Sequence, residues 1–297
     1  MEYVTLNNDV KMPILGFGVY QIPQNETKQA VLDAIKTGYR LIDTAQSYFN
    51  EKEVGDAIKE SGVPREEIFI TTKIWIEHYG YEKCKKSVEE SLKKLQTEYI
   101  DLVLLHQAFS DYYGAYRALE ELYEEGKIRA IGVSNFSPDR LTDICLFGRK
   151  IVPMVNQIET NPLHQRTFDQ ENMEKYGVQI MAWAPFGEGK NNMFNNETLV
   201  KIGEKYDKTA AQVILRWLIQ RKVVAVCKST HIERIEQNFD VFDFALSDDD
   251  MNEIKKLDSQ ESLFFSFTDP SMVEWFDQMV ETRKKQQDAS KEEKAWE

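Results

Sequence analysis

Residues Leu41 to Glu51 read LIDTAQSYFNE, a stretch in which an apolar run gives way to a short polar loop and then to a helical pattern. Asp43 stands where a strand would end, and Tyr48 follows in the loop. Apolar residues then recur at helical spacing from Glu51 to Ser61. We interpret the stretch as strand, loop and helix. An Asp at a strand end is most often a turn former or helix cap, but in α/β proteins active residues collect on loops after strands.

Strand and helix patterns alternate along most of the chain. Short apolar runs between amphipathic helices indicate parallel strands with both faces covered. Eight such units predict a closed (β/α)8 barrel, with an open doubly wound sheet as the alternative. The expected strands are Ile14–Val19, Tyr39–Asp43, Ile68–Thr72, Asp101–Leu105, Arg129–Val133, Val155–Ile158, Val178–Trp183 and Val223–Val226. The expected helices are Thr27–Lys36, Glu51–Ser61, Glu82–Leu95, Tyr113–Glu125, Pro138–Phe147, Thr167–Tyr176, Ala210–Gln220 and Ile232–Asn238.

Four segments lie outside these units. Residues 3–13 alternate apolar and polar side chains around Asn7-Asn8-Asp9, which predicts a β-hairpin before the barrel. Glu197–Tyr206 and Ser247–Leu257 predict extra helices, the second capped by Ser247 and lying in the C-terminal part. The tail at 283–297 is nearly all polar, and we expect a solvated or frayed end. With no linker between the segments, we expect one domain over 1–297.

Composition narrows the class of partner. The chain has 297 residues, 42% of them hydrophobic, and a net charge of -13 from 37 basic and 50 acidic residues. Phosphate backbones select basic surfaces, so this balance argues against nucleic-acid binding and against anionic membranes. Three cysteines without paired spacing predict neither disulfides nor a zinc site. We find no leader pattern and no run of about 18 apolar residues, so we expect a soluble cytoplasmic protein.

Two more strand ends carry ionisable side chains. Lys73 closes the third apolar run, and His106 follows the fourth. Taken singly, each is more often a solvated lysine or a packed histidine. A barrel, however, brings the carboxyl ends of its strands together. We therefore expect Asp43, Tyr48, Lys73 and His106 to form one cluster.

Several motifs then point to a family. They are Gly16-Phe17-Gly18, LIDTAQSYFNE, the Lys73 strand end, DLVLLH, GKIRAIGVSNF at 126–136, VNQIETNP at 155–162 and KSTHIERIEQNFDVFDFALSDDDM at 228–251. Occurring in this order, they make the chain resemble an aldo-keto reductase over nearly all its length. The resemblance places the family's catalytic tetrad on Asp43, Tyr48, Lys73 and His106, and it implies reduction of aldehydes or ketones to alcohols.

The chemistry agrees with those roles. Carbonyl reduction needs a proton on oxygen, and Tyr48 is the candidate donor. A free phenol has a pKa near ~10, and we expect the Lys73 ammonium to lower it. Asp43 would hold Lys73, and His106 would orient the carbonyl without a metal. The alternative is a cofactor-binding regulatory subunit of the same fold that is not catalytic.

The hydride must come from a cofactor, because no side chain supplies one. The usual G-x-G-x-x-G fingerprint is missing, and this family binds its nicotinamide cofactor without it. The resemblance implies hydrogen bonds from Ser134, Asn135 and Gln157 to the carboxamide, with Trp183 stacked on the ring. Taken without the resemblance, these residues could equally form a turn, a helix start and barrel-end packing. The cofactor-binding residues expected on this side are Gly18, Val19, Tyr20, Asp43, Ser134, Asn135, Gln157 and Trp183.

The phosphate end of the cofactor is expected after the eighth strand. Thr230 and Glu233 form a capping-box pattern, and a helix start with basic residues favours anions. A merely well-capped surface helix is the alternative. The resemblance implies NADPH rather than NADH, although Cys227 and His231 depart from the family pattern. The residues expected here are Lys228, Ser229, Arg234, Gln237 and Asn238.

The substrate pocket is predicted from strand ends and from the variable segment at 261–270. Gln107 replaces a tryptophan that is common in the family and makes the mouth more polar. Phe264 and Phe265 either close over the site or simply dock the terminal segment. We expect a small or medium aldehyde, ketone or dicarbonyl substrate, and a monomer, with a dimer as the alternative. The pocket residues expected are Tyr20, Trp75, Gln107, Phe264 and Phe265.

Overall fold

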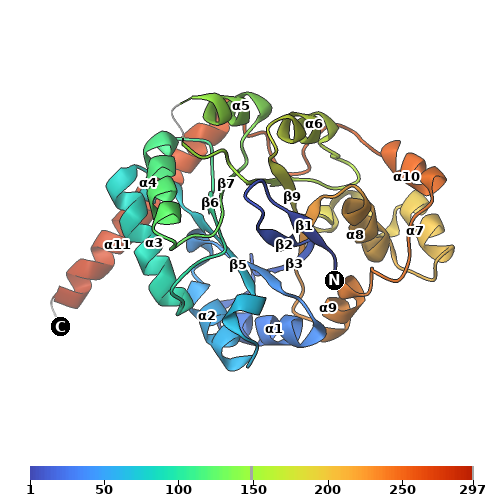
Figure 1. The fold of residues 1–297 in the computed structure, drawn as a ribbon, viewed down its shortest axis with the longest axis horizontal. Helices are drawn as coiled ribbons and strands as arrows, with labels where there is room; N and C mark the ends of the chain where they lie inside the picture. Colours follow the sequence, from blue (N-terminus) through green and yellow to red (C-terminus); the bar gives the residue numbers. More distant parts are fainter. Residues whose placement is uncertain (148–149, 296–297) are drawn as a thin grey trace. The chain divides into compact units, whose positions relative to one another are not determined.

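Within residues 1–147 and 150–295, which the computed structural model describes, eight parallel strands close into a barrel (Figure 1). The last strand pairs with both the first and the seventh, which closes the sheet. The strands are β3 (Leu15–Gly18), β4 (Leu41–Asp43), β5 (Phe69–Ile74), β6 (Leu102–Leu105), β7 (Ile131–Ser134), β8 (Val155–Glu159), β9 (Gln179–Trp183) and β10 (Val224–Cys227). The predicted (β/α)8 barrel is confirmed.

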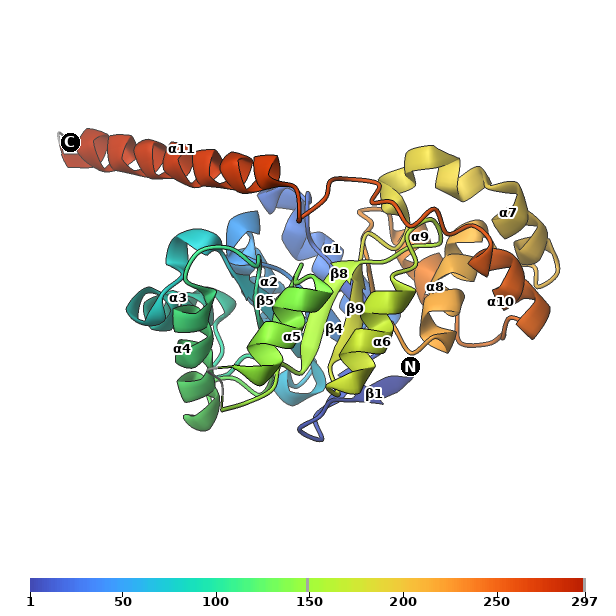
Figure 2. The ribbon, with the colours of Figure 1, turned by 90° about the horizontal axis from the view of Figure 1, so that it is seen from above.

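Helices follow the strands and surround the barrel (Figures 1 and 2). Those that complete the repeating units are α1 (Gln24–Thr37), α2 (Glu51–Glu60), α3 (Tyr81–Leu95), α4 (Tyr112–Glu124), α5 (Pro138–Leu146), α6 (Thr167–Lys175), α8 (Ala210–Gln220) and α9 (Ile232–Phe239). The predicted extra helices are α7 (Glu197–Glu204) and α10 (Asp248–Lys255), and Ser247 caps α10 by accepting from the Asp250 amide. Short 3-10 helices are η1 (Gln46–Tyr48), η2 (Arg65–Glu67), η3 (Ile76–His78) and η4 (Gly187–Asn195).

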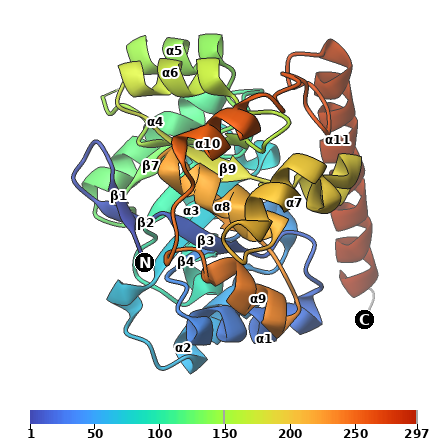
Figure 3. The same cartoon turned by 90° about the vertical axis from the view of Figure 1, so that its right-hand side faces the viewer.

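The barrel closes where its last unit meets its first. Helix α9 packs beside α1, as Figure 3 shows. Beneath them, β10 pairs with β3 in parallel, with Cys227 opposite Phe17. A side chain at Gly18 would bring a Cβ to 2.7 Å from Val226 Cγ1, so glycine permits this close approach. The strands are therefore tight at the rim where Gly18 and the Asp43 end of β4 meet.

The N-terminal hairpin lies at the other end of the strands. Its strands, β1 (Tyr3–Thr5) and β2 (Lys11–Pro13), pair antiparallel, as predicted. In its turn, Asn7 donates to the Pro153 carbonyl and Asn8 to the Arg129 carbonyl, both just before barrel strands. The hairpin therefore lies at the amino ends of the strands, away from the candidate residues at their carboxyl ends.

The chain divides into two compact units, Met1–Leu263 and Phe264–Glu297. The second contains the helix α11 (Pro270–Ala295), which begins well before the predicted tail. Within this unit the rings of Phe265, Phe267 and Phe276 pack together, with centroids 4.7 to 6.4 Å apart. The one-domain interpretation of the whole chain stays a prediction. Over the described residues, the helices are too short or too polar to cross a bilayer.

Candidate active site

Three of the four predicted tetrad residues are joined by hydrogen bonds at the carboxyl ends of adjacent strands. Asp43 ends β4, Lys73 lies in β5, and Tyr48 ends η1. The Lys73 ammonium donates to Asp43 Oδ1 at 2.5 Å and to the Thr44 carbonyl at 2.9 Å. It also lies 3.3 Å from the Tyr48 hydroxyl oxygen. Because Lys73 is only 1% exposed, its charge depends on these oxygen neighbours rather than on water.

The acidity of this group differs from the expectation. Burial raises the pKa of Tyr48 well above its usual range, and the Asp43 carboxylate and Tyr20 raise it further. Burial also lowers the pKa of Lys73, although Asp43 opposes that effect. The predicted lowering of the Tyr48 pKa by Lys73 is therefore wrong for this arrangement. Asp43 offsets much of the lysine charge, so the lost solvation of the phenolate dominates.

His106 completes the predicted cluster from the next strand. It follows β6, and its ring centroid lies 5.8 Å from that of Tyr48 and 5.2 Å from that of Trp75. Tyr20 approaches from the end of β3, with its ring 4.9 Å from Tyr48 and 52% of its surface exposed. Tyr20 and Trp75, two of the predicted pocket residues, therefore place aromatic rings against the tetrad residues Tyr48 and His106.

The residues predicted to bind a carboxamide come from the far side of the barrel. Ser134 ends β7 and donates to the Gln157 carbonyl at 2.9 Å. Asn135 has a left-handed backbone, with φ of 62°, and donates to the His106 carbonyl at 3.1 Å. The Trp183 indole N–H donates to Asn135 Oδ1 at 2.9 Å. Gln157 donates to Asp43 Oδ2 at 2.8 Å, so both groups of predicted residues meet in one site.

Comparison with known proteins identifies this arrangement. The model of the aldo/keto reductase family matches residues 15–259. The chain belongs to the aldo/keto reductase family. It is 47% identical to a glyoxal reductase of Bacillus subtilis (strain 168), over 88% of this chain and 94% of the relative.

Solved structures of aldo-keto reductases share its fold. One, from a Medee basin deep-sea metagenome library, has a TM-score of 0.87 at 46% identity, covering 90% of this chain and 98% of that one. A Bombyx mori aldo-keto reductase in complex with NADP has a TM-score of 0.84 at 32% identity, covering 89% of this chain and 95% of that one.

In this aldo/keto reductase, the predicted phosphate-binding residues gather beyond β10. Lys228 follows β10 directly, and Arg234 lies in the first turn of α9. Both are exposed, and neither forms an ion pair with another described residue. Ser229 and Asn238 are buried beside them, and Gln237 is exposed. Two exposed cations at a helix start, without acidic partners in the part of the chain that the structure describes, have the chemistry that favours an anion, and the phosphate site stays a prediction.

The predicted capping box at Thr230 and Glu233 is wrong. The residue that caps α9 is His231, which makes no side-chain cap hydrogen bond. Glu233 is therefore the second residue of the helix rather than the third, and a reciprocal box cannot form. Instead, Ser229 Oγ accepts from the His231 amide at 3.0 Å.

The structure adds residues that the sequence did not single out. Asn50 joins the first two units, because it donates to the Val19 carbonyl at 3.0 Å and accepts from Thr44. Gln46 accepts from the Trp75 amide at 3.0 Å, which ties η1 to the end of β5. Ser47 Oγ lies 3.5 Å from His106 Nδ1. All three lie within LIDTAQSYFNE, so polar residues flanking Tyr48 were the available signal.

The remaining predicted pocket residues have different outcomes. Gln107 is buried next to His106. Its backbone N–H donates to the Tyr79 hydroxyl, and its backbone carbonyl accepts from the same hydroxyl. A more polar mouth at Gln107 stays a prediction. Phe264 and Phe265 begin the second compact unit, and their closure over the site also stays a prediction.

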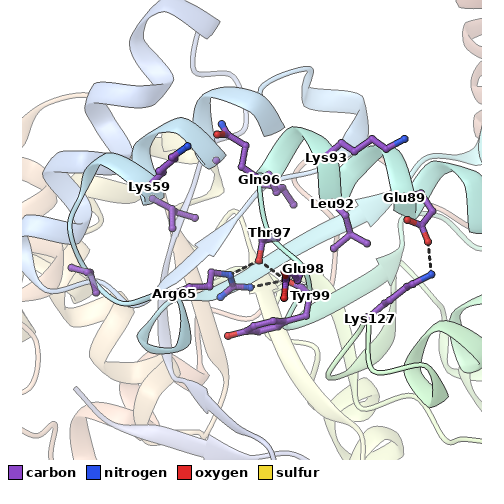
Figure 4. Close-up of a pocket in the computed structure, with 14 residues that line it drawn as sticks. Lys59, Arg65, Glu89, Leu92, Lys93, Gln96, Thr97, Glu98, Tyr99 and Lys127 are labelled. Atoms are coloured by element: carbon purple, nitrogen blue, oxygen red, sulfur yellow. Dashed lines mark hydrogen bonds and ion pairs between the residues drawn. The ribbon is translucent and has the colours of Figure 1, made fainter.

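A cavity of about 1010 Å³ lies away from these residues (Figure 4). Its walls come from α2, from the end of α3, and from segments that precede β5 and β6, including Arg65 and Tyr99. It therefore opens toward the amino ends of those strands and contains none of the predicted site residues. A cavity at that end of a barrel is typically structural, whereas catalysis uses the opposite rim.

Proposed function

We propose that this aldo/keto reductase reduces small aldehydes, ketones or dicarbonyls to alcohols, using NADPH. The observation that carries the proposal is a buried ammonium, Lys73, that bonds to the Asp43 carboxylate and lies 3.3 Å from the Tyr48 hydroxyl. The similarity to a glyoxal reductase supports a dicarbonyl among the substrates.

Tyr48 is the proposed proton donor. Its raised pKa keeps the hydroxyl protonated at neutral pH, as an acid must be before it donates. The proton passes to the carbonyl oxygen as negative charge develops there, and Lys73 stabilises the phenolate left behind. Asp43 keeps Lys73 oriented. His106, packed against the Tyr48 ring, donates a hydrogen bond to the carbonyl oxygen and sets its approach.

The residues present fit a dinucleotide with a phosphate at one end. When bound, NADPH supplies the hydride that carbonyl carbon needs. Ser134, Asn135, Gln157 and Trp183 would hold the nicotinamide end. Lys228 and Arg234, which are exposed and lack acidic partners among the described residues, would hold the phosphate end. The NADP complex of the Bombyx mori relative supports this choice of cofactor.

A panel of carbonyl compounds tests the proposal. Nitrobenzaldehyde, glyoxal, methylglyoxal and simple ketones are mixed with protein and either NADPH or NADH, and the loss of cofactor absorbance is followed. Tyr48→Phe should lower kcat by about 10²- to 10⁴-fold, because it removes the proton donor. Tyr113→Phe, which removes a phenol that bonds to Asp143 and to none of the tetrad residues, should keep wild-type turnover.

The outcomes separate the alternatives. NADPH consumption that depends on Tyr48 supports the proposal. NADPH binding without turnover of any carbonyl would instead indicate a regulatory subunit. Equal turnover by the wild type and Tyr48→Phe would exclude Tyr48 as the proton donor.

A further inference from the structure

We infer that Gln157 is a positioning residue for the proton donor, because its amide holds the carboxylate that orients Lys73. The catalytic consequence rests on the proposed function, whereas the hydrogen bond itself does not. Gln157 therefore has a role beyond the cofactor contact that the family resemblance implies for it.

The geometry accounts for both oxygens of Asp43. Oδ1 accepts from Lys73 at 2.5 Å, and Oδ2 accepts from Gln157 Nε2 at 2.8 Å. Asp43 is 4% exposed and Gln157 is 2% exposed, so water cannot replace either donor freely. No other described side chain donates to Oδ2. Removing Gln157 would leave a buried carboxylate oxygen without its donor, which is a costly change.

This hydrogen bond crosses the interior of the barrel. Gln157 lies in β8 and Asp43 in β4, and these strands are on opposite sides of the closed sheet. The bond continues through Lys73 to Tyr48, so one chain of contacts runs from β8 to the proposed acid. A shift of the Gln157 amide would therefore change where the Lys73 ammonium sits relative to the phenol.

The contact also decides how the Gln157 amide is oriented. A carboxylate only accepts, so the amide nitrogen of Gln157 must face Asp43. The same nitrogen lies 3.2 Å from Met181 Sδ, which occupies its second hydrogen. The Gln157 Oε1 atom is then the one left to accept from an N–H of a bound carboxamide.

A double-mutant cycle on the protein without cofactor tests the hydrogen bond directly. Gln157→Leu, Asp43→Asn and the double variant are unfolded with denaturant beside the wild type. Each single variant removes the same hydrogen bond between Gln157 and Asp43. The loss of unfolding free energy in the double variant should therefore be smaller than the sum of the two single losses. Additive losses would overturn the inference. Gln157→Met, which keeps the side chain unbranched, replaces Gln157→Leu if the latter does not fold.

Steady-state kinetics tests the positioning role. Gln157→Leu should lower kcat at saturating NADPH by about tenfold or more and change the pH profile of kcat. Tyr113→Phe, whose phenol bonds to Asp143 rather than to a tetrad or cofactor residue, should leave both unchanged. An unchanged kcat and pH profile in Gln157→Leu would overturn the inference. If the protein reduces no carbonyl but the cycle is non-additive, the proposed function fails and the Asp43 contact stands.

Discussion

Two buried carboxylates lie at opposite ends of the same barrel and have different surroundings. Asp43 ends β4 at the carboxyl rim, whereas Asp101 stands just before β6 at the amino end. Asp101 is 1% exposed and accepts from Arg65 at 2.7 Å, from Arg129 at 2.8 Å and from the Ile70 amide at 3.0 Å. Both carboxylates are thus buried and paired with cations.

The difference lies in what each cation touches next. Lys73 lies 3.3 Å from the hydroxyl of Tyr48, the proposed proton donor. Arg65 and Arg129 instead stack on the ring of Tyr99, at 4.2 and 5.9 Å, and Arg65 donates to backbone carbonyls. The two arginines stay protonated, and both oxygens of the Asp101 carboxylate already accept hydrogen bonds from them. The cluster therefore has no proton to transfer, and it stabilises the fold. A buried ion pair marks a candidate active site only where a proton can leave it.

The largest predicted effect comes from replacing Lys73, and the same replacement of Arg65 tests whether the two clusters differ in function. Lys73→Met should lower kcat for carbonyl reduction by at least about 10²-fold, because Tyr48, the proposed proton donor, loses its charged neighbour. It should also cost about 3–5 kcal/mol of unfolding free energy, because Asp43 loses its buried cation. Steady-state kinetics corrected for folded protein, with denaturant unfolding, measure both effects.

Arg65→Met is the matched control. It should cost only about 1–3 kcal/mol, since Arg129 still pairs with Asp101, and it should keep kcat within about twofold of the wild type. Loss of turnover in this variant comparable to that of Lys73→Met would remove the distinction between the two clusters.

The second prediction concerns Asp101 itself. Asp101→Ala should lower the unfolding free energy by about 3 kcal/mol, because two arginines and the Ile70 amide lose their acceptor. Turnover per folded molecule should not change, since the cluster lies away from the rim. Urea unfolding and the aldehyde assay at saturating NADPH provide the two measurements. A large fall in kcat with stability intact would assign Asp101 to the catalytic machinery.

The smallest predicted effect is a pH dependence at a third buried group. Burial lowers the pKa of His164, and Arg166 lowers it further. The unfolded chain therefore binds a proton more readily than the folded one as pH falls below about 6.5. Stability should be fully present above that pH and fall below it, by less than about 1 kcal/mol per pH unit. His164→Gln should flatten this fall in thermal unfolding followed from neutral to acidic pH, and an unchanged slope would contradict the assignment.

Much of the fold followed from local patterns. The end of β4 at Asp43 and both bounds of the helix Ala210–Gln220 were predictable because apolar spacing reports burial directly, whereas β5 ends at Ile74, one residue after the predicted strand end at Lys73. The helix α11 begins at Pro270, before the predicted tail at 283–297, and the apolar residues of its first turns were not recognised as a helix. The start of α9 was misjudged by one residue, and this error alone produced the wrong capping box.

The sequence by itself determined the alternation of buried strands and amphipathic helices and the four ionisable groups at neighbouring strand ends, because these are properties of spacing along the chain. Only the tertiary structure decided that Gln157 reaches Asp43 across 114 residues, and that burial raises the pKa of Tyr48. The physical reason is that barrel closure sets distances between opposite strands, and the solvation of a buried charge depends on every atom packed around it.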